Sequence, residues 1–389
     1  MQPLHSSSQE LTVLTLNCCL SVCPPVRFNG AFSRAHRLAD AIYSSIAPQS
    51  LDVVCFQELV VCHDSILKQM IHHPHHTHVK IESSLFGANV RFLHAGLAIC
   101  SRWPIVEEDA HVFYGATYHM EALMAKAIQY VKIVTHGGEH VLHVFNTHLQ
   151  AWTMPRACDI RREQTRQAAQ FIARKIGVDF MQTNDKNRHW CVVAGDWNVD
   201  DNEHPEIMAE VMQTLRTSML RPSTVQFSFD PCKNPLVSTD DPQEYATRSK
   251  QNGCYEEFLR TGICSCCPRQ LVDGIALHDG CSSFLQSYDT NVVPILSRTP
   301  FSINVNMSTR RTLDTVSDHF GVVSKMVFLP AFNHASIRFA DDVPRVYSYH
   351  PPVDAGWILL QIVLFIMFFI LLWKLLRWMM ERLHRSTKR

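Results

Sequence analysis

Short apolar runs rich in Val and Ile recur through the first 330 residues, and stretches with helical spacing separate some of them. Runs this short are typical of buried strands, whereas helices need longer periodic segments. We expect strands at residues 11–16, 52–56, 96–100, 127–134, 141–146, 190–194, 271–277 and 320–328. We expect one helix within residues 32–46, capped by Ser33, and a second at residues 160–176, opened by Asp159. This alternation predicts one α/β domain with mixed sheets over residues 1–330.

The composition fits a folded domain and limits the classes of partner that we expect it to bind. Hydrophobic residues make up 46% of the 389 residues, and 36 Lys and Arg balance 36 Asp and Glu. A mostly disordered chain would be less apolar and more highly charged. Proteins that grip nucleic acid need an excess of Lys and Arg against the phosphate backbone. We therefore expect a folded protein and no nucleic-acid partner.

The most apolar segment lies near the C-terminus. Residues 356–373 contain one strongly polar side chain, Gln361, and a helix of this length would cover about 27 Å. Trp357 and Trp373 lie at its ends, where an interfacial aromatic belt would be. We expect a linker at residues 331–354, a transmembrane anchor at 355–376 and a basic tail at 377–389.

The flanking sequences give conflicting indications of membrane topology. The basic tail favours a cytoplasmic C-terminus, which would place the long N-terminal domain on the other side of the membrane. Residues 1–10, however, have neither the basic residues nor the apolar core of a signal peptide. Without such a signal, a long domain most simply stays in the cytosol while the anchor inserts after synthesis. We expect a cytosolic domain on a single-pass anchor in the endoplasmic reticulum or another intracellular membrane.

The 14 cysteines fall into two groups. Cys55, Cys100 and Cys191 lie inside apolar runs and are expected to be buried free thiols. A second group crowds into and beyond an irregular insertion at about residues 221–270: Cys232, Cys254, Cys264, Cys266, Cys267 and Cys281. A disulfide knot, a zinc site and palmitoylated thiols all remain open for this group. The five histidines within residues 72–78 are expected to form a solvated loop.

Polar clusters follow several of the expected strands. They are Asn17, Gln57-Glu58, Asn146-Thr147-His148 and Gly195-Asp196-Trp197-Asn198, together with Ser317-Asp318-His319 just before the last strand. Ionisable groups in front of rigid strands are what a catalytic site at the rim of a sheet needs. Each cluster alone is weak evidence, but their joint order and flanks are specific.

This order resembles the endonuclease/exonuclease/phosphatase superfamily over residues 11–329. The resemblance implies a four-layer α/β sandwich of the DNase I-like type. Within that superfamily the chain is most similar to the neutral sphingomyelinases. The motifs that carry this similarity are AGLAICSRWPI at 95–105, Lys126, NTHLQA at 146–151, Arg161, Gln164 and FSFDPCKNPL at 227–236. Two positions depart from the pattern: Gly274 stands where an aromatic residue is usual, and Gln150 where His is frequent.

The resemblance implies a membrane-associated, Mg²⁺-dependent phosphodiesterase of the phospholipase C type. Such an enzyme would hydrolyse sphingomyelin or a related phosphosphingolipid in a bilayer to ceramide and a phosphorylated head group. Mg²⁺ prefers hard oxygen ligands, and Glu58 is the first-choice ligand with Asn17 beside it. Mn²⁺ is an alternative ion, and Asp318 is a candidate ligand for a second metal or a water.

The family's motifs also assign roles to the other site residues. His319 would be the general base, and Asp273 would hold its imidazole in the useful tautomer. Asp196 and Asn198 would orient the nucleophile and the phosphate. His148 and Lys126 would lie near the phosphate as a hydrogen-bond donor and a cation.

Two other functions stay open. A nuclease or another phosphoesterase of the same fold would use the same residues, although the charge balance and the apolar segment disfavour a nuclease. A membrane-tethered scaffold without catalysis is the non-enzymatic alternative. The complete set of candidate residues speaks against the scaffold, because a degenerate copy should have lost at least one of them.

Overall fold

The computed structural model describes most of the expected α/β domain. The described residues are 9–20, 30–79, 96–115, 121, 124–135, 140–152, 154–182, 189–230, 234, 270–304 and 310–329. All of them lie in one compact unit formed by Met1–Ile81 and Leu93–Asp341. The second unit, Glu82–Phe92 with Asp342–Arg389, lies outside them. So do the expected linker, anchor and basic tail. Across the ranges just given, no helix combines the length and apolarity that a bilayer crossing requires.

Two six-stranded sheets dominate the described residues. The first has the order β11-β14-β1-β2-β4-β3. Its strands are β1 (Gln9–Asn17), β2 (Val53–Gln57), β3 (His75–His78), β4 (Ala98–Ser101), β11 (Leu285–Val293) and β14 (Gly321–Phe328). Strands β1 and β2 are parallel, and β14 runs antiparallel to β1. The end of β1, the end of β2 and the start of β14 therefore lie at one edge of this sheet.

The second sheet has the order β5-β6-β7-β8-β10-β9. Its strands are β5 (Ile105–Val112), β6 (Ala127–Val134), β7 (Val141–His148), β8 (His189–Asp196), β9 (Thr217–Met219) and β10 (Asp273–His278). Strands β7 and β8 are parallel, and β10 is antiparallel to β8. The register pairs His148 with Asp196 on one side and Asp273 with Asp196 on the other.

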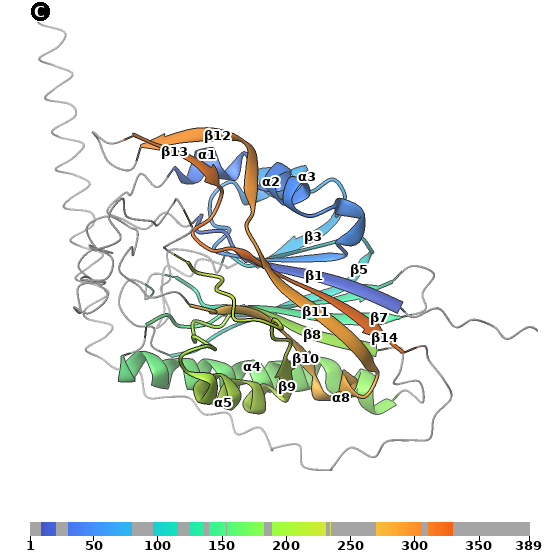
Figure 1. The fold of residues 1–389 in the computed structure, drawn as a ribbon. Coiled ribbons are helices and arrows are strands. Elements are labelled where there is room, and N and C mark those ends of the chain that lie inside the picture. The colour runs from blue at the N-terminus through green and yellow to red at the C-terminus, as the bar shows by residue number, and fades with distance from the viewer. Residues whose placement is uncertain are drawn as a thin grey trace, which may run out of the picture. The chain divides into compact units, whose positions relative to one another are not determined.

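Helices cover the outer faces of both sheets, which gives four layers (Figure 1). The first sheet carries α1 (Ala31–Ala35), α2 (Leu38–Ser45), α3 (His63–Gln69) and the hairpin of β12 (Leu296–Asn304) and β13 (Arg310–Thr315). The second carries α4 (Pro155–Gln182), α5 (Pro205–Leu215) and α8 (Asp279–Ser282). A short 3₁₀ helix, Pro48–Ser50, leads into β2.

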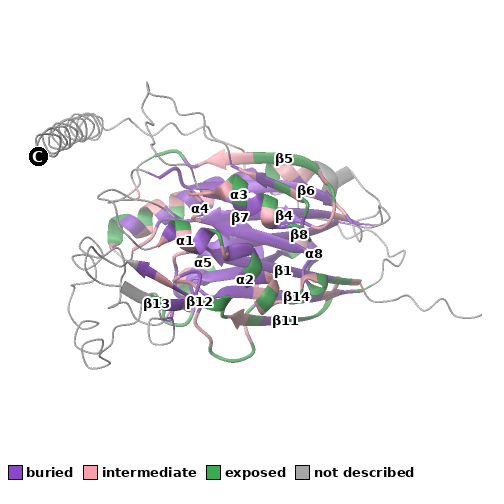
Figure 2. Ribbon diagram, turned by 90° about the horizontal axis from the view of Figure 1, so that it is seen from above, coloured by how far each residue is buried: buried purple, intermediate pink, exposed green. Residues whose placement is uncertain are grey.

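The main core lies between the sheets and extends to α4 and α5. Leu11 and Val53 of the first sheet belong to the same buried cluster as Val144 of the second and Phe171 of α4. Figure 2 shows that the central strands are buried along most of their length, whereas green segments lie on helices and on peripheral strands such as β5. Burying both faces explains why the central strands read as continuous apolar runs.

The eight expected strands are confirmed, with ends shifted by a few residues. The expected helix over residues 32–46 is wrong as one element: α1 ends at Ala35, α2 begins at Leu38, and Phe32 is 62% exposed. Ser33 lies inside α1, whose N-cap is Gly30. Helix α4 begins at Pro155, before Asp159.

Two further expectations concern histidine and cysteine. The expected histidine loop is wrong, because His75–His78 form β3 and His73 is buried. Cys55, Cys100 and Cys191 are buried free thiols, as expected. Cys281 is also buried and free, in α8. The other cysteines of its group lie outside the described residues.

Candidate active site

The strand ends bring the predicted residues to one edge of the sandwich. Asn17 and Glu58 come from the ends of β1 and β2, and His148 and Asp196 from the ends of β7 and β8. Gln57 joins the two sheets below them, because its amide nitrogen donates to Asn146 Oδ1 at 2.7 Å. The site is therefore built on strands that are fixed to each other by buried hydrogen bonds.

His319 and Asp273 form a hydrogen-bonded pair. His319 Nδ1 lies 2.6 Å from Asp273 Oδ2, and the Asp273 side chain is fully buried. The Ser228 hydroxyl accepts the backbone N–H groups of Val272 and Asp273, each at 3.1 Å. The contacts of Ser228 fix the backbone of Asp273, and the hydrogen bond to its carboxylate fixes the rotation of the imidazole ring.

His319 is also contacted by Ser317 in its own loop and by Phe229 from a segment distant in sequence. Its backbone N–H donates to Ser317 Oγ at 3.1 Å, and the Phe229 ring contacts the imidazole edge-on at a centroid distance of 5.4 Å. Ser317 Oγ also donates to the carbonyl of Asn17 at 2.5 Å. The loop before β14 is thereby tied to the end of β1.

Asp196 lies at the centre of the site. Its Oδ2 accepts from Asn17 Nδ2 at 2.9 Å, and its Oδ1 accepts the Asn198 backbone N–H at 2.9 Å. His148 Nε2 lies 3.5 Å from Oδ2. Burial, and then the negative charge of Asp273, raise the pKa of Asp196 to about 7. A second buried carboxylate with too little compensating charge has this effect.

Glu58 contributes a partly exposed carboxylate. Its side chain is 21% exposed, and Oε1 lies 3.2 Å from Asn17 Nδ2 and 4.0 Å from His148 Nε2. The backbone of Glu58 is left-handed, at φ +52°. Gly96 packs against this turn so closely that a Cβ there would lie 2.8 Å from Glu58 Cα.

Asn17 bridges the two carboxylates through the nitrogen of its amide. Nδ2 faces Glu58 and Asp196, whereas Oδ1 accepts the backbone N–H of Cys19 at 3.0 Å. In this orientation the Asn17 amide nitrogen holds the two carboxylates in place. For Asn17 to bind a metal through Oδ1, the amide group would have to flip.

The pKa values of the two histidines of the site are shifted in opposite directions. Burial, and then the charges of Lys126 and His319, hold the pKa of His148 well below its usual 6.5. Burial also lowers the pKa of His319, but Asp273, Asp318 and Asp196 outweigh it and raise this pKa well above 6.5. The environment therefore favours the neutral form of His148 and the protonated form of His319.

Lys126 is buried and already paired. Its Nζ lies 2.5 Å from Glu121 Oε1 and donates to the Leu149 carbonyl at 3.0 Å. Glu121 also accepts from the Gln150 side chain and from the Ala151 N–H. The sequence reasoning missed Glu121, because no apolar run precedes it.

The segment after β7 is braced from α4. Arg161 is buried and donates to the carbonyls of Gln150 and Trp152, at 2.6 and 3.0 Å. Gln164 Oε1 accepts the Gln150 backbone N–H at 2.7 Å. These two helix residues thus position the chain beside Lys126 rather than project into the site.

Asn198 and Asp318 occupy the two sides of the site. Asn198 has a left-handed backbone, at φ +52°, and its amide nitrogen donates to the Leu149 carbonyl at 2.9 Å. Asp318 Oδ1 lies 3.4 Å from Ser317 Oγ. Burial raises the pKa of the Cys19 thiol, and the negative charge of Asp318 raises it further. Among the described contacts, Asp318 is not joined to Glu58.

The position after Asp273 has no room for a side chain. A Cβ on Gly274 would lie 2.8 Å from Met219 Sδ and 3.1 Å from Trp197 Nε1. The Trp197 ring is fully buried. Gly274 is therefore matched to the large side chains of its own neighbours.

The donor set suits a hard divalent cation. The carboxylates of Glu58 and Asp196 both accept from Asn17 Nδ2. Asp273 Oδ1 is buried without a hydrogen-bond partner in the described part of the chain. Ligand atoms of Asp196, Asp273 and His319 lie within 4.8 Å of one another. Carboxylate oxygens are the ligands that Mg²⁺ prefers. A bound cation would offset the excess of buried negative charge that the raised pKa of Asp196 reports.

No protein-family profile matches the chain. Sphingomyelinase C of Bacillus cereus is 28% identical over 180 residues, which is 42% of this chain and 50% of the relative. A second Bacillus cereus sphingomyelinase C is 27% identical over 161 residues, 39% of this chain and 44% of the relative. The chain thus spans about half the length of the curated relatives it matches.

Solved structures extend the comparison to the whole fold. The crystal structure of SmcL has a TM-score of 0.59 at 21% identity, and sphingomyelinase C from Streptomyces griseocarneus 0.58 at 21%; each match covers 82% of this chain and 99% of the other. A beta toxin variant from Staphylococcus aureus with bound magnesium ions has a TM-score of 0.60 at 18% identity, covering 81% and 99%. The chain shares the fold of these proteins, and part of its sequence is similar to sphingomyelinase C.

Proposed function

We propose that the chain is a Mg²⁺-dependent phosphodiesterase of the phospholipase C type that hydrolyses sphingomyelin or a related phosphosphingolipid. The products would be ceramide and a phosphorylated head group. The observation that carries the proposal is the 2.6 Å His319–Asp273 pair, which lies beside Asp196 at the edge that also holds Glu58 and His148. The sequence similarity to sphingomyelinase C supports the choice of substrate class.

Hydrolysis of a phosphodiester needs charge compensation on the phosphoryl oxygens, an activated water and a steadied leaving oxygen. Glu58 would hold the Mg²⁺, because its carboxylate is the partly exposed one of the site. When bound, the ion would polarise a phosphoryl oxygen and neutralise developing charge. Asp318 would contact a second ion or a water, and Mn²⁺ could replace Mg²⁺.

His319 would act as the general base. The hydrogen bond from Nδ1 to Asp273 fixes the ring and leaves Nε2 as the nitrogen that takes a proton from water. The carboxylates that raise the pKa of His319 would stabilise the imidazolium formed in that step. Only the unprotonated ring can accept a proton, so activity should increase as the pH rises through the raised pKa of His319.

The other residues would bind and orient the phosphate. The lowered pKa of His148 favours its neutral form, whose Nε2 can donate a hydrogen bond without adding a charge next to Lys126. Asp196 and Asn198 would orient the nucleophile and the phosphate from the end of β8. Lys126 would act on the phosphate only if its pairing with Glu121 is exchanged, since Glu121 now holds its ammonium group.

The membrane part of the proposal depends on the sequence. An anchor at residues 355–376 would hold the catalytic domain against the bilayer that contains its substrate. We assign the domain to the cytosolic face of the endoplasmic reticulum or another intracellular membrane. Expression with a tag at each end, followed by protease protection of isolated membranes, would test this topology.

The test of the proposed function is release of water-soluble head group from mixed-detergent liposomes. The panel contains sphingomyelin, inositol phosphorylceramide, lysophosphatidylcholine and, separately, plasmid DNA, each with Mg²⁺ and with EDTA. His319→Ala should abolish release, and the matched control His76→Ala, an exposed residue of β3, should not. Nicking of DNA without lipid cleavage would make the protein a nuclease. Lipid cleavage that survives in His319→Ala would refute the assigned base.

A further inference from the structure

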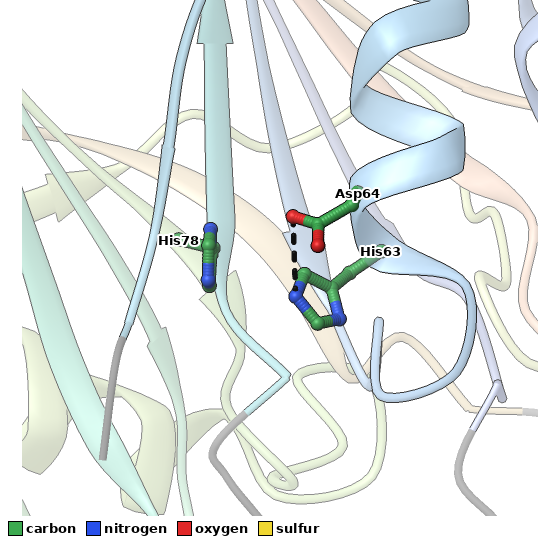
Figure 3. A group of neighbouring side chains, drawn as sticks. All are labelled: His63, Asp64 and His78. Carbon is green, nitrogen blue, oxygen red and sulfur yellow. Dashed lines mark ion pairs between the residues drawn. The ribbon is translucent and has the colours of Figure 1, made fainter. Parts of the chain in front are cut away.

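A second group of potential ligands lies outside the catalytic edge. It consists of His63, Asp64 and His78, and Figure 3 shows their side chains between the start of α3 and the neighbouring strand. One ligand atom from each lies within 4.8 Å of the other two. The group shares no residue with the cluster of Asp196, Asp273 and His319.

Local structure explains why these three side chains meet. Cys62 is left-handed, at φ +58°, and turns the chain so that His63 and Asp64 are the first two residues of α3. The helix buries Ile66 and Leu67, which leaves the side chains of its first two residues at the surface.

His78 reaches the group from the end of β3. This strand pairs with β4 and opposes His78 to Ala98. Thr77 is buried and donates to Glu108, so the alternation of the strand directs His78 to the other face. The His63 and His78 rings are 4.5 Å apart between centroids and inclined by 49°.

The geometry fits a metal that accepts nitrogen and oxygen ligands. Two ligands that are each about 2.0–2.1 Å from a tetrahedral Zn²⁺ lie about 3.4 Å apart. His63 Nε2 and Asp64 Oδ1 are separated by 3.4 Å. Two imidazoles and one carboxylate are a zinc ligand set, whereas Mg²⁺ takes oxygen ligands and retains its waters.

We propose that His63, Asp64 and His78 form a binding site for Zn²⁺, or a divalent ion of similar preference, with water in the fourth position. The side chain of Asp64 is 71% exposed and that of His63 27%, so solvent can reach an ion there. Residues 59–62 connect Glu58 to His63, so a bound ion ties the loop that follows Glu58 to the end of β3. The site does not depend on the catalytic activity proposed above.

Zinc binding by the full-length protein in detergent micelles tests this site. The protein is stripped with EDTA and then dialysed against ZnCl₂ with Mg²⁺ in excess, and bound zinc is counted by atomic absorption. The variant is His78→Ala, and the matched control is His76→Ala, two residues earlier on the same strand. His319→Ala removes the second histidine-containing cluster found among the described residues.

One more zinc ion should bind to wild type, to His76→Ala and to His319→Ala than to His78→Ala. The affinity of His78→Ala for this ion should be at least tenfold lower. Asp64→Asn should weaken the same ion, and Co²⁺ should give the absorption bands of a tetrahedral site in wild type but not in His78→Ala. Equal zinc binding by wild type and His78→Ala would overturn the site. So would loss of the ion in His319→Ala, because it would place the zinc at the catalytic edge.

Discussion

Asp196→Asn should remove one steep component of the pH dependence of stability. The folded protein holds the Asp196 carboxyl at a pKa of about 7, against its usual 3.8, because of burial and then the charge of Asp273. A group whose pKa rises on folding adds stability below its unfolded pKa. This stability is lost as the pH rises toward the folded pKa. Asn cannot titrate, so the variant lacks this loss.

The magnitude follows from the two pKa values. Each pH unit between them changes the free energy of unfolding by about 1.36 kcal/mol for one proton. From pH 4 to 6.5, the wild type should therefore lose about 3 kcal/mol relative to Asp196→Asn. The pH range ends at 6.5 so that it stays below the raised pKa of His319 in the folded protein. Asn also loses one of the two acceptors now used by Asn17 and Asn198, which lowers stability by about 1 kcal/mol at every pH.

Urea unfolding in EDTA at several pH values measures this difference. The buried ring of Trp197, next to Asp196, provides an intrinsic fluorescence signal. The quantity compared is the difference between wild type and variant, because titrating groups remote from Asp196 contribute equally to both. Parallel pH dependences for the two proteins would refute the claim that Asp196 is a buried carboxylate with too little compensating charge.

Three further changes test other parts of the site. Glu58→Gln should raise the Mg²⁺ concentration needed for activity, and an unchanged titration would place the ion elsewhere. Asp273→Asn should lower turnover about a hundredfold and move the acidic limb of the pH–rate profile to lower pH, because Asp273 raises the pKa of His319; an unmoved limb would contradict this pairing. Gly195→Ala should destabilise by about 3 kcal/mol in urea, since its Cβ would lie 2.1 Å from a carbonyl oxygen of β7, whereas Gly177→Ala in α4 has open space and should not destabilise.

The site could be predicted wherever a functional residue ends an apolar strand. Asn17, His148 and Asp196 each close a run of buried residues, and parallel pairing of the strands brings such ends to one edge. Asp273 begins an antiparallel strand, so it reaches the same edge from the opposite chain direction. The strand pattern and the polar residues at its ends therefore carried most of the information.

Other parts of the structure leave no such pattern. Strand β11 is largely exposed and β3 has a single buried residue, so both lack the apolar runs that mark buried strands. Glu121 contacts the distant backbone N–H of Ala151 as well as Lys126, and Ser228 contacts the distant backbone of Asp273. Contacts of this kind depend on how the layers pack, and sequence spacing does not encode them.

His148 and His319 show how one site can assign different roles to the same residue type. Burial lowers both pKa values, but the charges around the two rings differ. Lys126 adds to the effect of burial at His148, whereas three carboxylates reverse it at His319. When the environments of two groups shift their pKa values apart, one group can act as hydrogen-bond donor and the other as base at the same pH. The division proposed for this chain therefore rests on the carboxylates around His319 and on the position of Lys126, and not on the histidines alone.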